Sequence, residues 1–77
     1  MKYLIMEDFV GQAIPFIFPR RVNHLDMREQ LPYGKVLSGG FVEFRDGVLF
    51  CFGGHTELDV KASEDDQDVL LEALRSR

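Results

Sequence analysis

The sequence of 77 residues is poor in residues that crosslink a fold or hold a metal, with one cysteine, two histidines and no tryptophan. A lone Cys51 cannot form an internal disulfide, which excludes the disulfide-stapled scaffolds of secreted proteins and favours a reducing, cytoplasmic compartment. Neither histidine falls in a spacing typical of metal ligands, so we expect no structural metal, no cofactor and no assignable catalytic residue.

Long apolar runs are also missing. The first run, Tyr3–Met6, stops at Glu7 and Asp8, whereas the apolar core of a signal peptide needs about 7–15 residues. No stretch approaches the roughly 18 apolar residues that identify a membrane span. We therefore expect neither a signal peptide nor a membrane segment.

The formal charge of −4 is unevenly distributed, because residues 1–45 sum to +1 and residues 46–77 to −5. An acidic chain is repelled by phosphate backbones, so nucleic acid is disfavoured as a partner. One local cluster offers a possible anion contact, formed by Arg20, Arg21 and Arg28 beside His24. Asp26 and Glu29 dilute its charge, and the alternative is a solvated turn and helix face.

The first half of the chain predicts a hairpin and a short helix. Lys2–Met6 and Ala13–Phe18 are short apolar runs separated by polar turn residues. Pro15 cannot donate a ladder hydrogen bond, so its strand should lie at a sheet edge or carry a bulge. Asn23 is typical of a helix N-cap, and the helix should end near Leu31.

The strongest local signal is Asp46-Gly47 between Phe41–Arg45 and Val48–Phe52, which predicts a hairpin with a two-residue turn. That turn sets the register of the two strands. Arg45 then faces Val48, and the pairing continues away from the turn to Phe41, which faces Phe52. One face is then wholly apolar, with Val42, Phe44, Leu49 and Cys51. The other face combines Phe41, Phe50, Phe52 and Val48 with Glu43 and Arg45. Gly39-Gly40 and Gly53-Gly54 should form bends or bulges at the open end.

The last third predicts a strand followed by a helix. Thr56–Lys61 alternates apolar and polar residues, as a strand with one wet face does. Ser63 and Asp66 have capping-box spacing, and acidic residues in the first turn suit the helix dipole. The broad apolar face of this helix consists of Val69, Leu70, Leu71, Ala73 and Leu74.

Together these elements predict one α+β domain spanning residues 1–77 in the order ββαβββα. The natural packing is a curved, mainly antiparallel sheet of about five strands with the C-terminal helix on one face. The alternative is a small, partly open β-barrel with a helix.

Few residues have a pattern that suggests chemistry. Cys51 and His55 lie four apart, but the register puts Cys51 on the apolar face, where a cysteine is an inert hydrophobe. His55 follows two glycines and should lie on a bend outside the ladder. His24, His55, Asp26 and Asp59 have no regular metal-ligand spacing.

The stretch Leu37–Val42, the hairpin to Cys51 and the run Leu58–Leu74 resemble a group of small uncharacterised proteins encoded by bacteriophages and prophages. The resemblance covers about the last half of the chain. It brings no activity and no residue roles, and it implies a bacterial or phage cytoplasmic origin and a non-enzymatic role.

Two classes of function follow. The apolar residues Phe41, Phe50 and Phe52, with Glu43 and Arg45 at the wetter end, predict a patch that meets a second copy or another protein. The chain would then be a structural or interaction module. The alternative for these rings is that the helices or a curled sheet cover them. The alternative function is a small ligand-binding domain or enzyme that uses the Gly53-Gly54-His55 bend.

Overall fold

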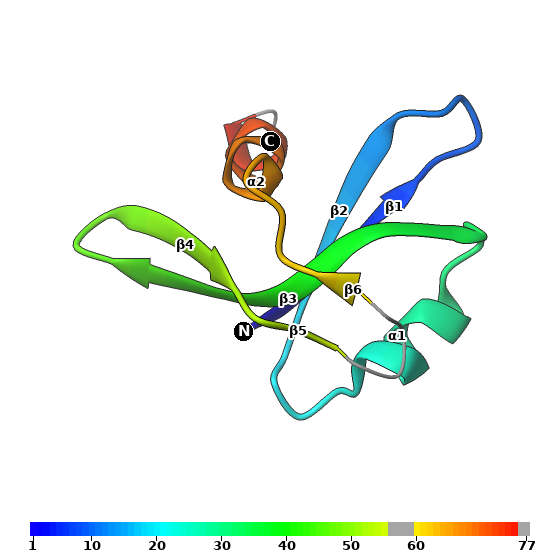
Figure 1. Cartoon of the computed structure of the whole chain (residues 1–77), viewed down its shortest axis with the longest axis horizontal. Helices are drawn as coiled ribbons and strands as arrows, with labels where there is room; N and C mark the ends of the chain where they lie inside the picture. The colour runs from blue at the N-terminus through cyan, green and yellow to red at the C-terminus, as the bar shows by residue number, and fades with distance from the viewer. Residues whose placement is uncertain (56–59, 76–77) are drawn as a thin grey trace.

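A computed structural model describes residues 1–55 and 60–75, which form an antiparallel α+β fold (Figure 1). The elements are β1 (Lys2–Glu7), β2 (Ala13–Phe18), α1 (His24–Gln30), β3 (Lys35–Arg45), β4 (Val48–Phe52), β5 (Gly54–His55), β6 (Val60–Lys61) and α2 (Asp66–Arg75). The first four strands form a sheet in the order β2-β1-β3-β4, while β5 and β6 form a separate two-stranded sheet. The predicted α+β class is therefore confirmed.

The number and order of strands differ from the prediction. The main sheet holds four strands instead of about five, and it is open, with β2 and β4 at its edges, so the barrel alternative is wrong. β5 was not predicted, because two residues are too few for an alternating pattern. Of the predicted strand Thr56–Lys61, Val60–Lys61 forms β6, and residues 56–59 lie outside the described part of the chain.

Local signals in the first half of the sequence are confirmed. The Asp8 carboxylate accepts two backbone N–H groups of the β1–β2 turn, at 2.9 and 2.8 Å. β2, which contains Pro15, is an edge strand. Asn23 caps α1, because its side-chain oxygen accepts the N–H of Leu25 at 2.8 Å.

The hairpin of β3 and β4 has the predicted register, from Arg45 opposite Val48 to Phe41 opposite Phe52. Its turn places Asp46 at φ 51° and Gly47 at φ 80°. Positive φ at both central residues is the requirement that makes Asp-Gly favourable in this turn.

β3 is longer than predicted, because it starts at Lys35 and runs through Gly39 and Gly40. The register irregularity lies opposite Ile5 and Met6 instead, where Leu37 is the additional residue. A Cβ on Gly40 would collide with the carbonyl oxygen of Phe52. This glycine therefore permits close approach of two backbones within a strand, and β3 runs through it without the sharp bend that a glycine pair can permit.

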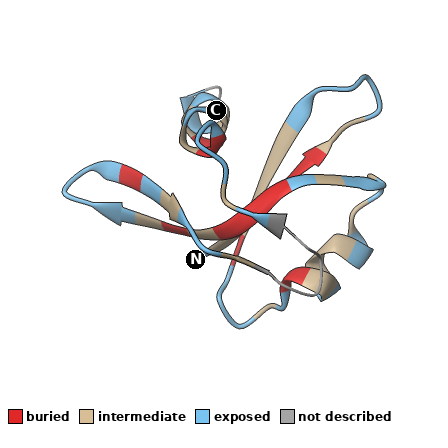
Figure 2. Ribbon diagram, in the orientation of Figure 1, coloured by how far each residue is buried: buried red, intermediate tan, exposed pale blue. Residues whose placement is uncertain are grey.

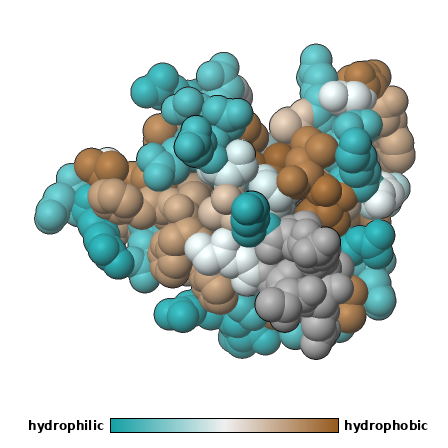
Figure 3. Space-filling model, in the orientation of Figure 1, coloured by the Kyte–Doolittle hydropathy of each residue, from teal (hydrophilic) through white to brown (hydrophobic). Residues whose placement is uncertain are grey.

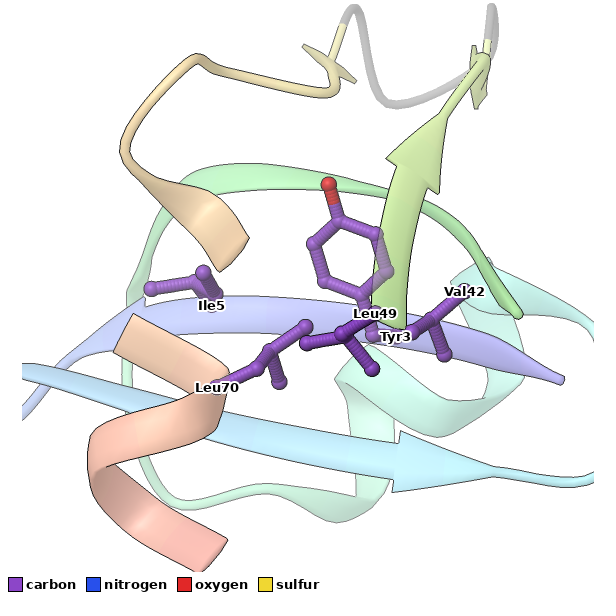
Figure 4. Packing of buried hydrophobic residues seen from close by; sticks show 5 residues of the cluster. All are labelled: Tyr3, Ile5, Val42, Leu49 and Leu70. Atoms are coloured by element: carbon purple, nitrogen blue, oxygen red, sulfur yellow. The ribbon is translucent and has the colours of Figure 1, made fainter. Parts of the chain in front are cut away.

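The sheet is packed on both faces of β1, whose residues alternate between two apolar clusters. α2 covers one face, and its cluster contains Tyr3, Ile5, Val42, Leu49 and Leu70 (Figure 4). α1 and the segments flanking it cover the other face, where Leu4, Met6 and Phe18 are buried. Burial is concentrated on β1 and the middle of β3, and it decreases toward the tip of the β3–β4 hairpin (Figure 2).

We predict that Leu70→Ala lowers the free energy of unfolding by about 2–5 kcal/mol, because Leu70 is fully buried and its truncation leaves a cavity. Leu74→Ala is the matched control on the same helix. Leu74 is 40% exposed, which is less burial than its place on the apolar face of the helix suggested. Its truncation should therefore lower the free energy of unfolding markedly less. Urea unfolding measures both. Equal losses would contradict the packing of α2 through Leu70.

Candidate interaction surface

The hairpin face turned away from α2, here called the outer hairpin face, consists of Phe41, Glu43, Arg45, Val48, Phe50 and Phe52. Its apolar column on β4 is largely uncovered, with Val48 50%, Phe50 41% and Phe52 42% exposed. Apolar side chains also gather over this hairpin in the space-filling view, on the left (Figure 3). Phe50 and Phe52 are therefore not part of an internal core.

Phe41 differs from the other two rings because its neighbours partly cover it. It stacks on Phe52 with the ring centroids 5.7 Å apart, and it forms a T-shaped contact with the His24 ring at a centroid distance of 5.8 Å. The Arg20 guanidinium lies 5.6 Å from the centroid of the Phe41 ring. α1 and the turn before it thus cover the base of the face and leave its middle and tip open.

A charged pair lies beside the exposed rings. Arg45 donates two hydrogen bonds to the same oxygen of Glu43, from Nε at 3.0 Å and from Nη2 at 2.7 Å. The Arg45 guanidinium also lies 5.7 Å from the centroid of the Phe50 ring. An arginine on an aromatic ring gains a cation–π attraction, so Arg45 shields part of Phe50 from water.

The opposite, inner face of the hairpin is apolar, as predicted, but not uniformly buried. Val42 and Leu49 lie under α2, whereas Phe44 is exposed near the tip. An open groove of about 510 Å³ separates the hairpin from the end of α2, and it is lined by Met1, Ile17, Val42, Glu43, Phe44 and Leu74.

A buried polar cluster fixes the start of α2. The Asp66 carboxylate accepts hydrogen bonds from the Tyr3 hydroxyl, from Ser38 Oγ at 2.7 Å and from the Ser63 N–H at 2.8 Å. The bond to Ser63 is one half of the predicted capping box. The bonds to Tyr3 and Ser38 could not be predicted from local patterns, although a tyrosine in a buried strand must find a partner for its hydroxyl.

Cys51 lies next to this cluster on the apolar face of the hairpin, as predicted, and is half-buried. Burial, with the negative charge of Asp66, raises the pKa of the Cys51 thiol to about 11, although a hydrogen bond with Tyr3 opposes the shift. Burial and the same carboxylate also raise the pKa of Tyr3. Both groups are therefore neutral at pH 7, and Cys51 is a weak nucleophile.

His55 lies outside the β3–β4 ladder, as predicted. The prediction that it lies on a bend was wrong, because its backbone pairs with Val60 in the β5–β6 sheet. The bend belongs to Gly53, at φ 72°. The side chain of His55 and all of Asp59 lie outside the described part of the structure. Within residues 1–55 and 60–75, no group of three or more His, Cys, Asp or Glu side chains is arranged to hold a metal.

The basic residues of the first half contact different neighbours. Arg20 lies over Phe41, Arg28 donates to the Gly34 carbonyl at 3.5 Å, and Arg21 is exposed. His24, predicted to lie beside them on a solvated face, is buried instead, with Nε2 2.9 Å from the Gly40 carbonyl oxygen. Its ring fills space between Phe18 and Phe41, because an imidazole has apolar faces as well as polar nitrogens.

Comparison with known protein families, with curated proteins and with solved structures finds no match for this chain. Across the described residues, no helix has the length and apolar character needed to cross a membrane.

We predict that Cys51 reacts slowly with thiol reagents in the native protein at pH 7.5. A thiol with a pKa of about 11 has roughly 10²-fold less thiolate than an unperturbed cysteine. Native labelling should accelerate as pH rises toward 11, and denaturant at pH 7.5 should make it fast. Equally rapid labelling of native and denatured protein would contradict this environment.

Asp66→Asn should lower the free energy of unfolding by about 1.5–3 kcal/mol, because the amide nitrogen cannot accept the bonds that one carboxylate oxygen receives from Tyr3 and Ser63. Asp65→Asn, at the exposed neighbouring position, is the control and should change stability by about 0.5 kcal/mol at most. Thermal and urea unfolding of both variants measure the difference. A neutral Asp66→Asn would show that the cluster contributes little to anchoring α2.

Proposed function

We propose that this chain is a non-enzymatic structural or protein-interaction module that associates with a second copy of itself through the outer hairpin face. The observation that carries the proposal is the exposure of Val48, Phe50 and Phe52 on adjacent positions of one strand face. Exposed large apolar side chains that are contiguous mark interaction sites, whereas scattered ones need no explanation.

The size of the face agrees with weak association. At these exposures, each phenylalanine leaves about 80 Å² uncovered, and with Val48 the column exposes roughly 250 Å². A stable interface buries about 800 Å² on each partner, so this column can supply the apolar centre and the hairpin rim must supply the remainder. We therefore expect a dissociation constant in the micromolar range.

The charge of the outer hairpin face does not oppose a second copy as the occupant. The whole chain carries −4, so two copies repel each other over most of their surface. The outer hairpin face contains one anion and one cation, Glu43 and Arg45, already paired with each other. It is thus a neutral face on an acidic protein, and burying it between two copies adds no net repulsion.

Phe50→Glu is the direct test, because Phe50 lies mid-strand opposite Glu43 and a new carboxylate there cannot be buried in an apolar contact. Wild-type protein should sediment as a dimer at about 100 μM, well above a micromolar dissociation constant. The variant should sediment as a monomer with an unchanged circular dichroism spectrum. Val10→Glu, at an exposed apolar position in the β1–β2 turn, is the control and should remain dimeric.

Two outcomes would contradict the proposal. A wild-type protein that is monomeric at this concentration has no self-association to explain. A dimer that persists in Phe50→Glu but dissociates in Val10→Glu would move the interface to the β1–β2 turn.

A further inference from the structure

The charged pair on the outer hairpin face can be reached by a second protein molecule. Glu43 and Arg45 lie two residues apart on β3, so both point to the same face. Their side chains are 37% and 66% exposed, although they contact each other. An exposed ion pair of this kind contributes little to the stability of a single chain. Its two members are therefore free to take other partners of opposite charge.

We infer that in the dimer each Glu43 pairs with Arg45 of the second copy, with the twofold axis crossing β3 between these two residues. The inference rests on the proposed function, since it names the contacts that set the register of that interface. In a twofold contact, whenever residue i of one copy meets residue j of the other, j also meets i. One axis position therefore exchanges the ion pair within each copy for two identical ion pairs between the copies.

The arrangement of charges selects this axis among the simple alternatives for two hairpins packed face to face. An axis through Glu43 would bring two glutamates together, and an axis through Arg45 would bring two arginines together. Like charges across an interface are strongly unfavourable. An axis parallel to the strands would place β3 of one copy over β4 of the other, which leaves both charges against apolar side chains and without partners.

The same axis also aligns the apolar column. Phe50 is paired with Glu43 in the hairpin, and Val48 is paired with Arg45. When Glu43 faces the second copy's Arg45, Phe50 consequently faces the second copy's Val48, and the reverse contact is made on the other side of the axis. In this register the charged side chains of one copy face the charged side chains of the other, and the apolar side chains face apolar ones. Moving the axis along the strands to the next pair of residues would destroy the match.

The test uses two single charge reversals, Glu43→Arg and Arg45→Glu. Each variant alone places like charges opposite each other across the axis, so its homodimer should weaken at least about tenfold relative to wild type. An equimolar mixture should form a heterodimer, because two arginines in one copy then face two glutamates in the other. Glu29→Arg, an exposed charge reversal on α1, is the control and should leave the wild-type dissociation constant within about twofold.

Sedimentation of each variant and of the mixture separates this inference from the proposed function. Recovery of a dimer only in the mixture supports the register. If wild type is dimeric and Phe50→Glu is monomeric, but the mixture associates no more tightly than either variant, then the face is the interface and the Glu43–Arg45 exchange is wrong. A monomeric wild type instead overturns the proposed function, and the inference falls with it.

Discussion

The carboxylate of Asp66 is the interaction on which the arrangement of the layers depends. It joins three segments that are distant in sequence, because its hydrogen bonds come from Tyr3 on β1, Ser38 on β3 and the backbone of Ser63 before α2. A buried carboxylate is unfavourable unless hydrogen bonds compensate for lost hydration, and this one receives them on both oxygens. Non-directional apolar packing by Leu70 alone would allow α2 to slide along the sheet.

Fixing α2 in this way determines what remains exposed. α2 covers the sheet face that carries Tyr3 and Leu49. The short α1 and the turn before it cover the opposite face over β1 and β2 and along β3 as far as Phe41. The described chain has no further helix for the outer side of the β3–β4 hairpin, which extends beyond both (Figure 1). A domain of this size has too few elements to cover both faces of a four-stranded sheet, so one aromatic surface stays open.

The features that could be predicted from sequence are those decided by neighbouring residues. Asp46-Gly47 determines the hairpin register, Asn23 begins α1, and Pro15 marks an edge strand, because turn, cap and ladder chemistry act over a few positions. The extension of β3 through Gly40 and the burial of His24 depend instead on contacts between distant segments. The outer hairpin face could be identified from the hairpin register alone. The exposure of each of its rings depends on where α1 packs, and no local sequence pattern encodes that packing.

Arginine stacking explains how an open aromatic face is compatible with a folded single chain. Arg20 lies over Phe41 and Arg45 over Phe50, so two of the three rings have a guanidinium against them before any partner arrives. A guanidinium is weakly hydrated, so it can cover apolar surface while its charge stays in contact with water. This cover lowers the free-energy cost of leaving the aromatic face exposed. Arg45 is stacked on Phe50 within the single chain, so part of its side-chain entropy is already lost there. The same residues therefore make the single chain tolerable in water and keep the face ordered, as the proposed weak association would require.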